Sequence, residues 1–585
     1  MTSIKSTSTT STSKGRRVLL RHKAEIICGV LLLLMGLNLI TAIRRKSLTN
    51  DEFYNIPAGY YNLAARDFGI NNVHPPLIRM ISAAPLLPLH LQMPPRQPSE
   101  NAILGGHQTF TAFWFANLGR LEEIAFWSRV PMIALTLLLG IVIFVFARRL
   151  FGPRAGILSV LLFSFEPTVL AHGRIVQTDV PAALAYVFFC FMLYRFTSEP
   201  TMRRAIIVGL ACGLALLTKS SLIVTVPIFA LTALVLLWRA PRQSGKRAAL
   251  LVQIGVATLA MLLLINAAYF FQRAGLEATD ARWIAAESPT RFQQIMAGLG
   301  VLSKIVPPYF LFVFYVVSVI NHQGWPTSLL GMYGQTGWWY YFPVAFALKT
   351  TLPFLLVSIG SLGWGTWQLF AKKKIDFLWL LGPLFIYATL TMSSNINIGI
   401  RHFLPVFPFL FILGGAFLDR LLKLYHSKIG FAAVILMLCL MSIETVRAYP
   451  DYVSYMNQLA WQHPRWYYLS DSNVEWGDDV RELAEYLRAR GETKVTAALL
   501  GGWLTLRAYG VEYIDALEPS NGKPETHYIA IGASYLNGAT VPGNLKNKDG
   551  APLTEQARHD FFAAYRGRAP EAVFGNSIYL FRTGK

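Results

Sequence analysis

Charged residues are scarce in this chain, and acidic residues are the scarcer sign. Its 585 residues are 54% hydrophobic and 15% charged, with 53 Lys and Arg against 32 Asp and Glu. This composition excludes an ordinary soluble enzyme, because helical runs of roughly 20 apolar residues are long enough to cross a hydrocarbon core of about 30 Å. The cations lie in short blocks between apolar runs, so the net charge of +21 does not indicate a nucleic-acid-binding face.

Cysteines and glycine-rich motifs are also few. The four cysteines all lie inside apolar runs, where the usual role is that of an inert buried thiol rather than a disulfide or metal ligand. The sequence has no Walker or dinucleotide-binding glycine pattern and no internal repeat. The sequence therefore gives no support to a redox function or to a soluble nucleotide-binding domain.

Long apolar runs predict an α-helical polytopic membrane protein with about eleven spans. The length of the first run and the absence of an A-x-A cleavage site favour a membrane helix over a cleaved signal peptide. The predicted spans are residues 26–43, 127–147, 155–171, 181–196, 205–218, 222–238, 248–271, 343–370, 377–392, 403–418 and 429–446.

Basic blocks in alternate loops predict the orientation, because cytoplasmic loops carry an excess of Lys and Arg. The Ser/Thr-rich segment 1–23 also ends in basic residues, so we expect a disordered cytoplasmic tail and a C-terminus outside the inner (plasma) membrane. The basic loops contain Arg148, Arg149 and Arg154; Arg195, Arg203 and Arg204; Arg239, Arg242, Lys246 and Arg247; Lys372, Lys373 and Lys374; and Arg420, Lys423 and Lys428.

The predicted membrane domain covers residues 24–449, with long outer loops at 44–126 and 272–342. Residues 305–320 in the second loop are apolar enough to span, but one more span would place the Lys372 block outside. We interpret this run as a re-entrant or interfacial element.

The last part of the chain, residues 450–585, has a different character. Acidic residues become frequent, and the apolar runs at 494–500, 527–531 and 577–581 have the length of strands. Residues 479–489 have the spacing of an amphipathic helix. We therefore predict a small extracytoplasmic α/β domain.

Polar motifs collect on the predicted outer side, beginning with Asp51-Glu52 directly after the first span. Two adjacent acids at this place have a structural interpretation, in which Thr49, Asn50 or Asp51 caps an interfacial helix and the acids face its N-terminal dipole. A functional interpretation is equally open for the pair taken alone.

The other outer motifs are ambiguous one by one. His74 opens a His-Pro-Pro-Leu sequence that can simply start a helix. Glu166 lies at membrane depth, where an ionisable side chain is costly and usually faces a polar cavity. Asp179 follows Thr178 in a possible helix cap, and Lys219 and Arg401 can be cations that reach back to the interface.

Taken together, the outer cations are a stronger indication of function than each one alone. Arg174, Lys219 and Arg401 stand one in each tight outer turn, against the positive-inside preference. An anionic ligand at the outer surface would offset that disadvantage. A phosphate held by several cations beside a carboxylate that can take a proton forms a site for displacing a phosphate leaving group.

These motifs resemble the GT-C fold glycosyltransferases of family 39 type, the group of protein O-mannosyltransferases and aminoarabinose transferases. The resemblance covers residues 26–446 and depends on the order and sidedness of its motifs. The motifs are Asp51-Glu52, His74-Pro75-Pro76-Leu77-Ile78-Arg79, Arg174 to Asp179, Thr218-Lys219 and Gly399 to Pro405. The resemblance implies a GT-C fold, a lipid-phosphate sugar donor, an inverting transfer, and the first acid of the Asp-Glu pair as catalytic base.

Carried onto this chain, the resemblance implies that Asp51 deprotonates the acceptor hydroxyl. A divalent metal cofactor is left open. The residues implied to hold the acceptor or a metal are Glu52, His74, Glu166 and Asp179. The residues implied to bind the donor phosphate are Arg79, Arg174, Lys219, Arg401 and His402.

Two further clusters have a structural and a functional interpretation. The segment 471–479 places Asp, Ser and Asn before an amphipathic helix, and we favour a helix cap there. An exposed Trp476 among acids and amides would instead resemble a sugar-contacting surface. The aromatic run 338–342 is most simply an interfacial belt, or else the lining of a lipid or sugar groove.

The sequence therefore predicts a multi-pass inner-membrane glycosyltransferase that moves a sugar from a polyprenyl-phosphate carrier to an acceptor on the extracytoplasmic face. The expected partners are this donor, a protein, lipid or glycan acceptor, and membrane lipids. A lipid or polysaccharide acceptor in place of a protein stays open, as does a non-enzymatic flippase or transporter for lipid-linked sugar. The β-trefoil insertion of the eukaryotic enzymes is absent, which indicates a bacterial relative.

Overall fold

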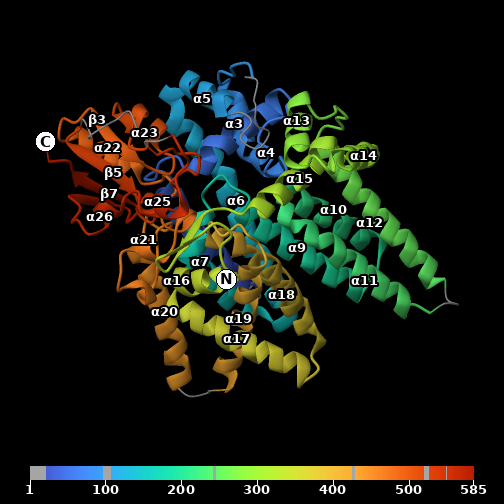
Figure 1. Ribbon diagram of the computed structural model, residues 1–585. Helices are drawn as coiled ribbons and strands as arrows, with labels where there is room; N and C mark the ends of the chain where they lie inside the picture. Colours follow the sequence, from blue (N-terminus) through green and yellow to red (C-terminus); the bar gives the residue numbers. More distant parts are fainter. Residues whose placement is uncertain are drawn as a thin grey trace, which may run out of the picture.

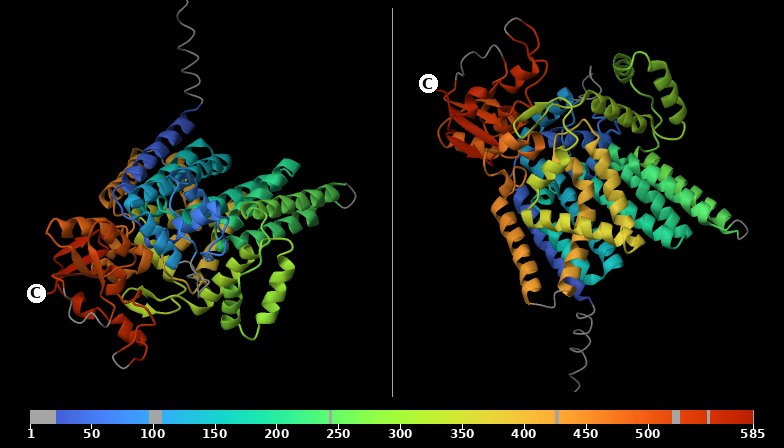
Figure 2. Two further views of the ribbon diagram at one scale, coloured as in Figure 1. Left: turned by 90° about the horizontal axis from the view of Figure 1, so that it is seen from above. Right: turned by 60° about the horizontal axis from the view of Figure 1, so that its bottom comes forward.

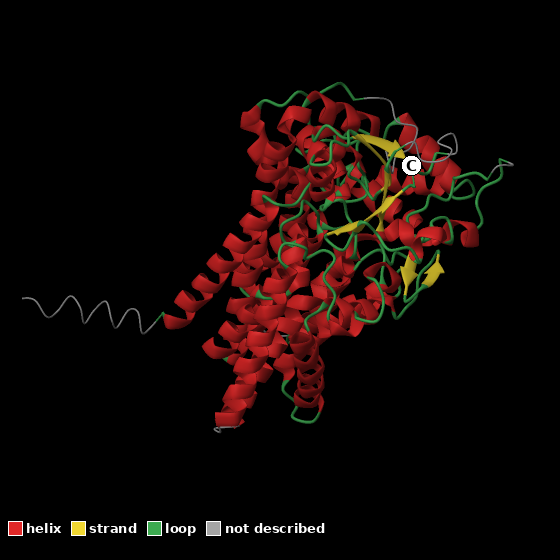
Figure 3. Cartoon of the chain, turned by 90° about the vertical axis from the view of Figure 1, so that its left-hand side faces the viewer, coloured by secondary structure: helices red, strands yellow, loops and turns green. Residues whose placement is uncertain are grey.

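The protein consists of a large helical body and a smaller C-terminal domain that contains a sheet (Figure 1). The strands form a two-stranded and a five-stranded sheet, and helices make up most of the rest of the molecule (Figure 3). The computed structural model describes residues 22–96, 107–241, 245–424, 428–518, 526–547 and 550–584. Almost all of the predicted tail 1–23 lies outside the described residues.

Each predicted span corresponds to one helix or to a pair of successive helices. The helices of the body are α2 (Lys23–Ile43), α6 (Leu121–Phe151), α7 (Pro153–Ser164), α8 (Pro167–His172), α9 (Asp179–Ser198), α10 (Met202–Thr218), α11 (Thr225–Arg239), α12 (Lys246–Ala268), α16 (Tyr341–Lys349), α17 (Leu352–Phe370), α18 (Leu378–Met392), α19 (Phe407–Leu424) and α20 (Lys428–Ala448). Among the described residues, eight helical segments are long and apolar enough to cross a membrane. These findings confirm the predicted fold class of a polytopic helical protein with a C-terminal sheet domain.

Three predicted spans are not among the eight long apolar helical segments, and one of them, 205–218, is the 17-residue helix α10, which is shorter than a full span. The predicted span 155–171 is interrupted before Pro167, and the predicted span 343–370 is interrupted before Pro353. Proline ends or starts a helix because it lacks an N–H donor and clashes with the preceding turn. The side chains of Glu166 and Thr351 at these breaks are fully buried, as expected for broken helices that face protein rather than lipid.

Small residues allow the helices of the body to approach closely. A Cβ atom added to Gly209 in α10 would lie 2.0 Å from the carbonyl oxygen of Ala257 in α12. A Cβ atom on Gly415 in α19 would lie 2.6 Å from the carbonyl oxygen of Ala155 in α7. Such close backbone contact is a common way of packing helices in membranes, where burial of apolar surface gives no driving force between them.

The two long loops form a layer of shorter elements at one end of the body. The first loop contains α3 (Asn50–Ala64), α4 (Leu77–Ala83), η1 (Ala84–Leu89), α5 (His107–Ala116) and η2 (Leu118–Arg120). The second contains α13 (Ala278–Glu287), α14 (Phe292–Leu302), α15 (Pro308–Gln323), β1 (Thr327–Leu329) and β2 (Met332–Gly334). The run predicted to be re-entrant or interfacial is the 16-residue helix α15, which is shorter than a full span.

The C-terminal domain has a five-stranded sheet with the strand order β4-β3-β5-β7-β6. β3 (Lys494–Ala498) pairs in parallel with β4 (Glu512–Asp515) and β5 (Tyr528–Gly532), whereas β7 (Ile578–Arg582) runs antiparallel to β5 and to β6 (Ala572–Phe574). The three inner strands lie on the predicted runs. The two edge strands have four and three residues, too short to give a periodic signal.

The predicted amphipathic helix is α22 (Val480–Arg488), whose Val480, Leu483, Ala484 and Leu487 are buried against the sheet. The C-terminal domain and the N-terminal end of α2 lie at opposite ends of the body (Figure 2, right). The first long loop lies beside the C-terminal domain, whereas α13 and α14 of the second loop lie on the other side of the molecule (Figure 1). Their sidedness relative to the cytoplasm stays a prediction.

We expect single cysteines at Lys373 and Arg488 to label from opposite sides of the membrane, because the first is in a basic loop and the second is in the C-terminal domain. Both positions are exposed. In a background without the four native cysteines, Arg488→Cys should react with an impermeant maleimide on intact spheroplasts. Lys373→Cys should react only after permeabilisation. Equal reaction of both variants on intact spheroplasts would show that the predicted orientation is wrong.

Candidate active site

Asp51 lies in the first turn of α3, the outer helix that follows the first span. Thr49 is the N-cap residue, and its backbone N–H donates to the Glu52 carboxylate at 2.9 Å while its hydroxyl accepts from the Glu52 N–H at 3.4 Å. This reciprocal capping box satisfies the helix end. The cap therefore accounts for Thr49 and Glu52, and leaves the Asp51 side chain to other contacts.

Asp51 faces two side chains from much later in the sequence. Its Oδ2 accepts from Nη1 of Arg401 at 2.6 Å, and its Oδ1 accepts from the indole N–H of Trp476 at 3.3 Å. The guanidinium carbon of Arg401 lies 4.4 Å from the centroid of the Trp476 ring. The Asp51 side chain is 27% exposed and that of Arg401 is 9% exposed, so the carboxylate is the open member of the pair.

A second pair of opposite charges lies beside the first. Lys219, at the C-terminal end of α10, binds Asp179, the first residue of α9, and both side chains are buried. Arg401 Nη1 also lies 3.7 Å from Asp179 Oδ2. We call the four residues Asp51, Asp179, Lys219 and Arg401 the Asp51 cluster. It joins two carboxylates and two cations from four separate segments.

Two histidines border the Asp51 cluster. Burial lowers the pKa of His74 well below its ordinary value, and Lys219, Arg401 and Arg79 lower it further. His402 follows Arg401 directly in the sequence. A neutral imidazole can donate or accept a hydrogen bond without adding charge, so the His74 ring suits a polar part of a ligand.

Glu52 is fully occupied by structural contacts. Its Oε1 accepts from Nε of Arg129 at 2.7 Å and from the Val176 N–H at 3.1 Å, and its Oε2 accepts from Nη2 of Arg129 at 2.6 Å. Burial alone raises the pKa of Glu52, but the charge and hydrogen bonds of Arg129 outweigh burial and lower it. The pair joins the start of α3 to the spanning helix α6, which leaves Glu52 little capacity for an acceptor or a metal.

Two of the cations implied to bind phosphate have other partners. Arg79 donates from Nε to Asn62 at 2.7 Å and from Nη1 to the Asn71 carbonyl, and burial lowers its pKa to about 10. Arg174 is fully buried and donates from Nη2 to Asp478 of the C-terminal domain at 2.9 Å. Their phosphate-binding roles stay predictions, and the structure places neither in the Asp51 cluster.

Glu166 is also separate from the cluster. Its Oε2 accepts from the hydroxyl of Thr351 at 3.3 Å, so its contact is with the break between α16 and α17. Of the acceptor or metal candidates, Asp179 belongs to the Asp51 cluster, and His74 lies near the cluster's cations Lys219 and Arg401. The structure therefore brings together Asp51, Asp179, Lys219 and Arg401, with His74 and His402 at the border.

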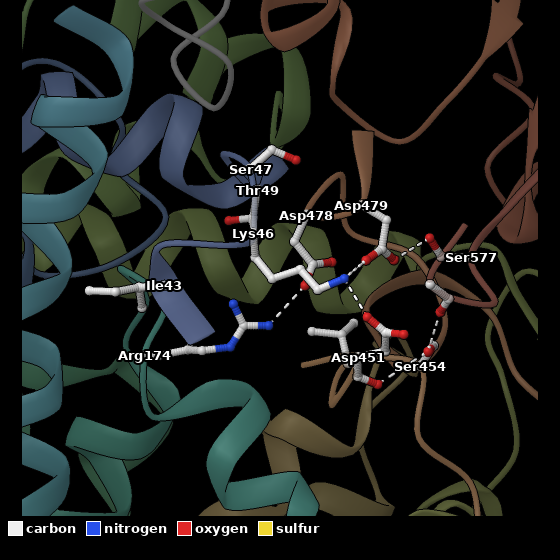
Figure 4. A network of polar contacts seen from close by, with 12 residues as sticks. Ile43, Lys46, Ser47, Thr49, Arg174, Asp451, Ser454, Asp478, Asp479 and Ser577 are labelled. Atoms are coloured by element: carbon white, nitrogen blue, oxygen red, sulfur yellow. Dashed lines mark hydrogen bonds and ion pairs between the residues drawn. The ribbon is translucent and has the colours of Figure 1, made fainter. Parts of the chain in front are cut away.

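Lys46, which the motif analysis did not single out, holds the C-terminal domain to the first loop (Figure 4). Its Nζ is fully buried and binds Asp451, Asp479 and Glu482, the last at 3.1 Å. Burial lowers the pKa of Lys46, but these acids and Asp478 outweigh it and raise the pKa above its ordinary value. The pairing of Arg174 with Asp478 lies in the same network (Figure 4).

The acids around Lys46 are also a possible metal-binding group. Asp451, Asp479 and Glu482 each offer an oxygen atom within 4.8 Å of the others. The ammonium group of Lys46 already binds all three, so the donor set fits a cation that the chain itself supplies. Within the described part of the chain, the predicted metal candidates Glu52, His74, Glu166 and Asp179 form no group of this kind.

Arg129 is another residue that the motifs did not single out, and the sequence suggested Trp476 only as an exposed residue that could contact a sugar. Arg129 lies inside an apolar span, and a cation at membrane depth is itself a signal of a buried partner. Trp476 lay in a segment that we had interpreted as a helix cap. Asp479 does occupy the N-cap position of α22, but its side chain makes no capping bond.

Part of the chain matches a known protein family. Residues 107–270 match the family model described as dolichyl-phosphate-mannose-protein mannosyltransferase. This match confirms the predicted resemblance. The same match, together with the long apolar helices, supports the predicted class of membrane glycosyltransferase. No curated protein matches the chain.

Two solved structures are among those similar to this chain. ArnT from Cupriavidus metallidurans, bound to undecaprenyl phosphate, has 14% sequence identity and a TM-score of 0.47, with 96% of this chain and 98% of that chain covered. The archaeal oligosaccharyltransferase AglB from Archaeoglobus fulgidus, in complex with an inhibitory peptide and a dolichol-phosphate, has 12% identity and a TM-score of 0.41. The second comparison covers 86% of this chain and 69% of that chain.

Glu52→Gln should destabilise the protein by about 3–5 kcal/mol, because it leaves Arg129 buried without its counter-ion. The measurement is unfolding in mixed micelles with increasing dodecyl sulfate. Glu123→Gln is the matched control, since it removes an exposed pair with Arg120 in the same region. Surface pairs contribute little, so the control should unfold like the parent protein. Equal unfolding of both variants would contradict a structural role for Glu52.

Proposed function

We propose that this protein transfers a sugar from a polyprenyl-phosphate carrier to an acceptor hydroxyl on the extracytoplasmic face of the inner membrane, with inversion at the sugar. The Asp51 cluster carries this proposal, since it holds a partly exposed carboxylate beside two buried cations. Such a displacement needs a base for the acceptor proton and positive charge for the leaving phosphate. The matched family and the apolar helices support the same class of enzyme.

In the proposed reaction, the acceptor hydroxyl gives its proton to Asp51 as its oxygen forms a bond to the anomeric carbon. The bond from that carbon to the phosphate oxygen breaks, and its electron pair stays on the lipid phosphate. Arg401 and Lys219 bind the phosphate as its negative charge grows. A single displacement of this kind inverts the configuration of the sugar.

Arg401 links donor binding to the activation of the base. In the structure its guanidinium is paired with Asp51, and its Nε is buried without a partner among the described residues. A phosphate that takes donors from Arg401 competes with Asp51 for the guanidinium, which frees Asp51 Oδ2 for the acceptor hydroxyl. Donor binding thus prepares Asp51 for the acceptor.

The acidic group around Lys46 serves a structural purpose in this proposal. A divalent cation could bind Asp451, Asp479 and Glu482 only if the Lys46 ammonium left them. The reaction as written uses charges of the chain and needs no metal for its steps. An assay with polyprenyl-phosphate sugars as donors, and with peptide, lipid and glycan acceptors in separate reactions, identifies the sugar and the class of acceptor.

Asp51→Asn should lower turnover by about 10² to 10⁴-fold, the usual contribution of a general base. The variant keeps the size of the side chain and can still accept from the Trp476 indole. Asp67→Asn is the control, an acid of the same outer loop that pairs with Arg96 at 3.1 Å. Near-normal turnover of a folded Asp51→Asn protein would remove Asp51 as the base.

Arg401→Met and Lys219→Met should each lower kcat/KM for the lipid-phosphate donor by roughly 10- to 100-fold, because each removes charged hydrogen bonds to the phosphate. Arg203→Met is the control, since Arg203 is exposed at the opposite end of α10 from Lys219. The control should keep the donor kinetics of the parent protein.

A donor comparison tests the lipid-phosphate assignment directly. Transfer from a water-soluble nucleotide sugar, in the absence of any polyprenyl-phosphate sugar, would overturn it. Movement of intact lipid-linked sugar across vesicles without transfer to any acceptor would instead favour the transporter alternative.

A further inference from the structure

The segment 471–479 has neither of the roles that its sequence suggested. Trp476 is only 1% exposed, so it does not present an open surface to a sugar. The side chain of Asp479 binds Lys46 and Ser577 instead of capping α22. The segment is buried between the C-terminal domain and the outer loops, so its contacts with these two parts indicate its function.

The backbone of this segment is tied to the loop that carries Asp51. The Asn50 N–H donates to the carbonyl of Trp476 at 2.9 Å, and the Ser47 N–H donates to the carbonyl of Asp478 at 2.9 Å. Asn50 is the first residue of α3, where helix N–H groups lack partners within the helix. The carbonyl of Trp476 therefore fixes the start of the helix on which Asp51 is placed.

The other side of the segment is tied to the loop that carries Arg401. The Ile400 N–H donates to Asn473 Oδ1 at 2.9 Å, and the Ser472 hydroxyl donates to the Ile398 carbonyl at 2.8 Å. These contacts are adjacent to Arg401. The segment thus bridges the two loops that contribute the ion pair of Asp51 and Arg401.

Two basic side chains of the helical body hold the segment in place. Arg174 binds Asp478 at 2.9 Å, and Lys349 donates from Nζ to the carbonyl of Asn473 at 2.6 Å. Both side chains are almost completely buried. Hydrogen bonds away from water are strong and directional, so these contacts hold this part of the C-terminal domain against the body.

The indole of Trp476 then contacts both members of the ion pair. Its N–H donates to Asp51 Oδ1 at 3.3 Å, while its ring face lies 4.4 Å from the Arg401 guanidinium carbon. The ring of His172 packs edge to face against the Trp476 ring, with 5.5 Å between the two ring centroids. A buried aromatic face attracts a guanidinium without adding a charge that would compete with a phosphate.

We propose that Trp476 is a positioning residue of the active site, through which the C-terminal domain orients Asp51 and retains Arg401. This inference rests on the proposed function. The indole N–H fixes Asp51 through Oδ1 and leaves Oδ2 for the acceptor proton once Arg401 turns toward the donor phosphate. The ring face keeps Arg401 beside the cluster during that exchange. Trp476 thereby controls the geometry in which the Asp51 carboxylate meets the acceptor hydroxyl.

The test is Trp476→Phe, which keeps a buried ring over Arg401 and removes the N–H donor. We expect kcat to fall about tenfold, the effect of one hydrogen bond to a charged group, while KM for the polyprenyl-phosphate sugar changes less than about twofold. A residue that only supported the fold would change both constants or the amount of folded protein. The split between kcat and KM separates the two roles.

Trp114→Phe is the matched control. Trp114 is also a fully buried tryptophan, and its indole N–H donates at 2.9 Å to the carbonyl of Phe53 in the same helix α3. The variant also loses a buried indole hydrogen bond, but this bond is to a backbone carbonyl and not to Asp51. We expect kcat for this variant to stay close to that of the parent protein.

If Trp476→Phe does not fold, benzothienylalanine at position 476 gives the same test, because sulfur replaces the N–H in a ring system of nearly the same size. Unchanged kcat for the folded Phe or benzothienylalanine protein would overturn the inference, as would equal losses for Trp476→Phe and Trp114→Phe. Failure of the parent protein to use any polyprenyl-phosphate sugar would overturn the proposed function itself. The two failures are therefore distinguishable.

Discussion

The ion pair between Asp51 and Arg401 is the contact on which the rest of the site depends. It joins two residues 350 positions apart, at a carboxylate–guanidinium distance of 2.6 Å. Arg401 also lies 3.7 Å from Asp179, which in turn binds Lys219. The pair therefore links the first outer loop to three turns of the helical body. It places the proposed base and the two cations proposed to bind phosphate within one cluster.

Several of the buried charges are paired with an opposite charge. An unpaired charge away from water costs several kcal/mol, whereas a paired and hydrogen-bonded one is tolerated. Arg129 binds Glu52, Arg174 binds Asp478, and Lys46 binds a group of acids. Two of these three pairs cross from the helical body or first loop to the C-terminal domain. The charges thus fix the position of that domain as well as the site.

Under the proposed function, this arrangement gives the C-terminal domain a part in the chemistry. Its sheet and α22 form a core of their own, yet the segment that precedes α22 lies between the loops of Asp51 and Arg401. A helical body alone would leave the start of α3 without the carbonyl of Trp476, and Arg174 without its acid. The site is complete only when both parts of the chain are folded together.

The sequence by itself determined the helical membrane body, the strands β3, β5 and β7, and the buried face of α22. Apolar run length and periodicity are local properties, and they survive in any tertiary context. It also identified Asp51, Asp179, Lys219 and Arg401 as candidates, because polar residues at the ends of apolar runs stand out. Tertiary structure alone decided which of them meet, and it gave Glu52 and Arg174 partners elsewhere. The contribution of Trp476 could not be predicted, since a contact between residues hundreds of positions apart is fixed by the packing of the whole chain and leaves no periodic trace in the sequence.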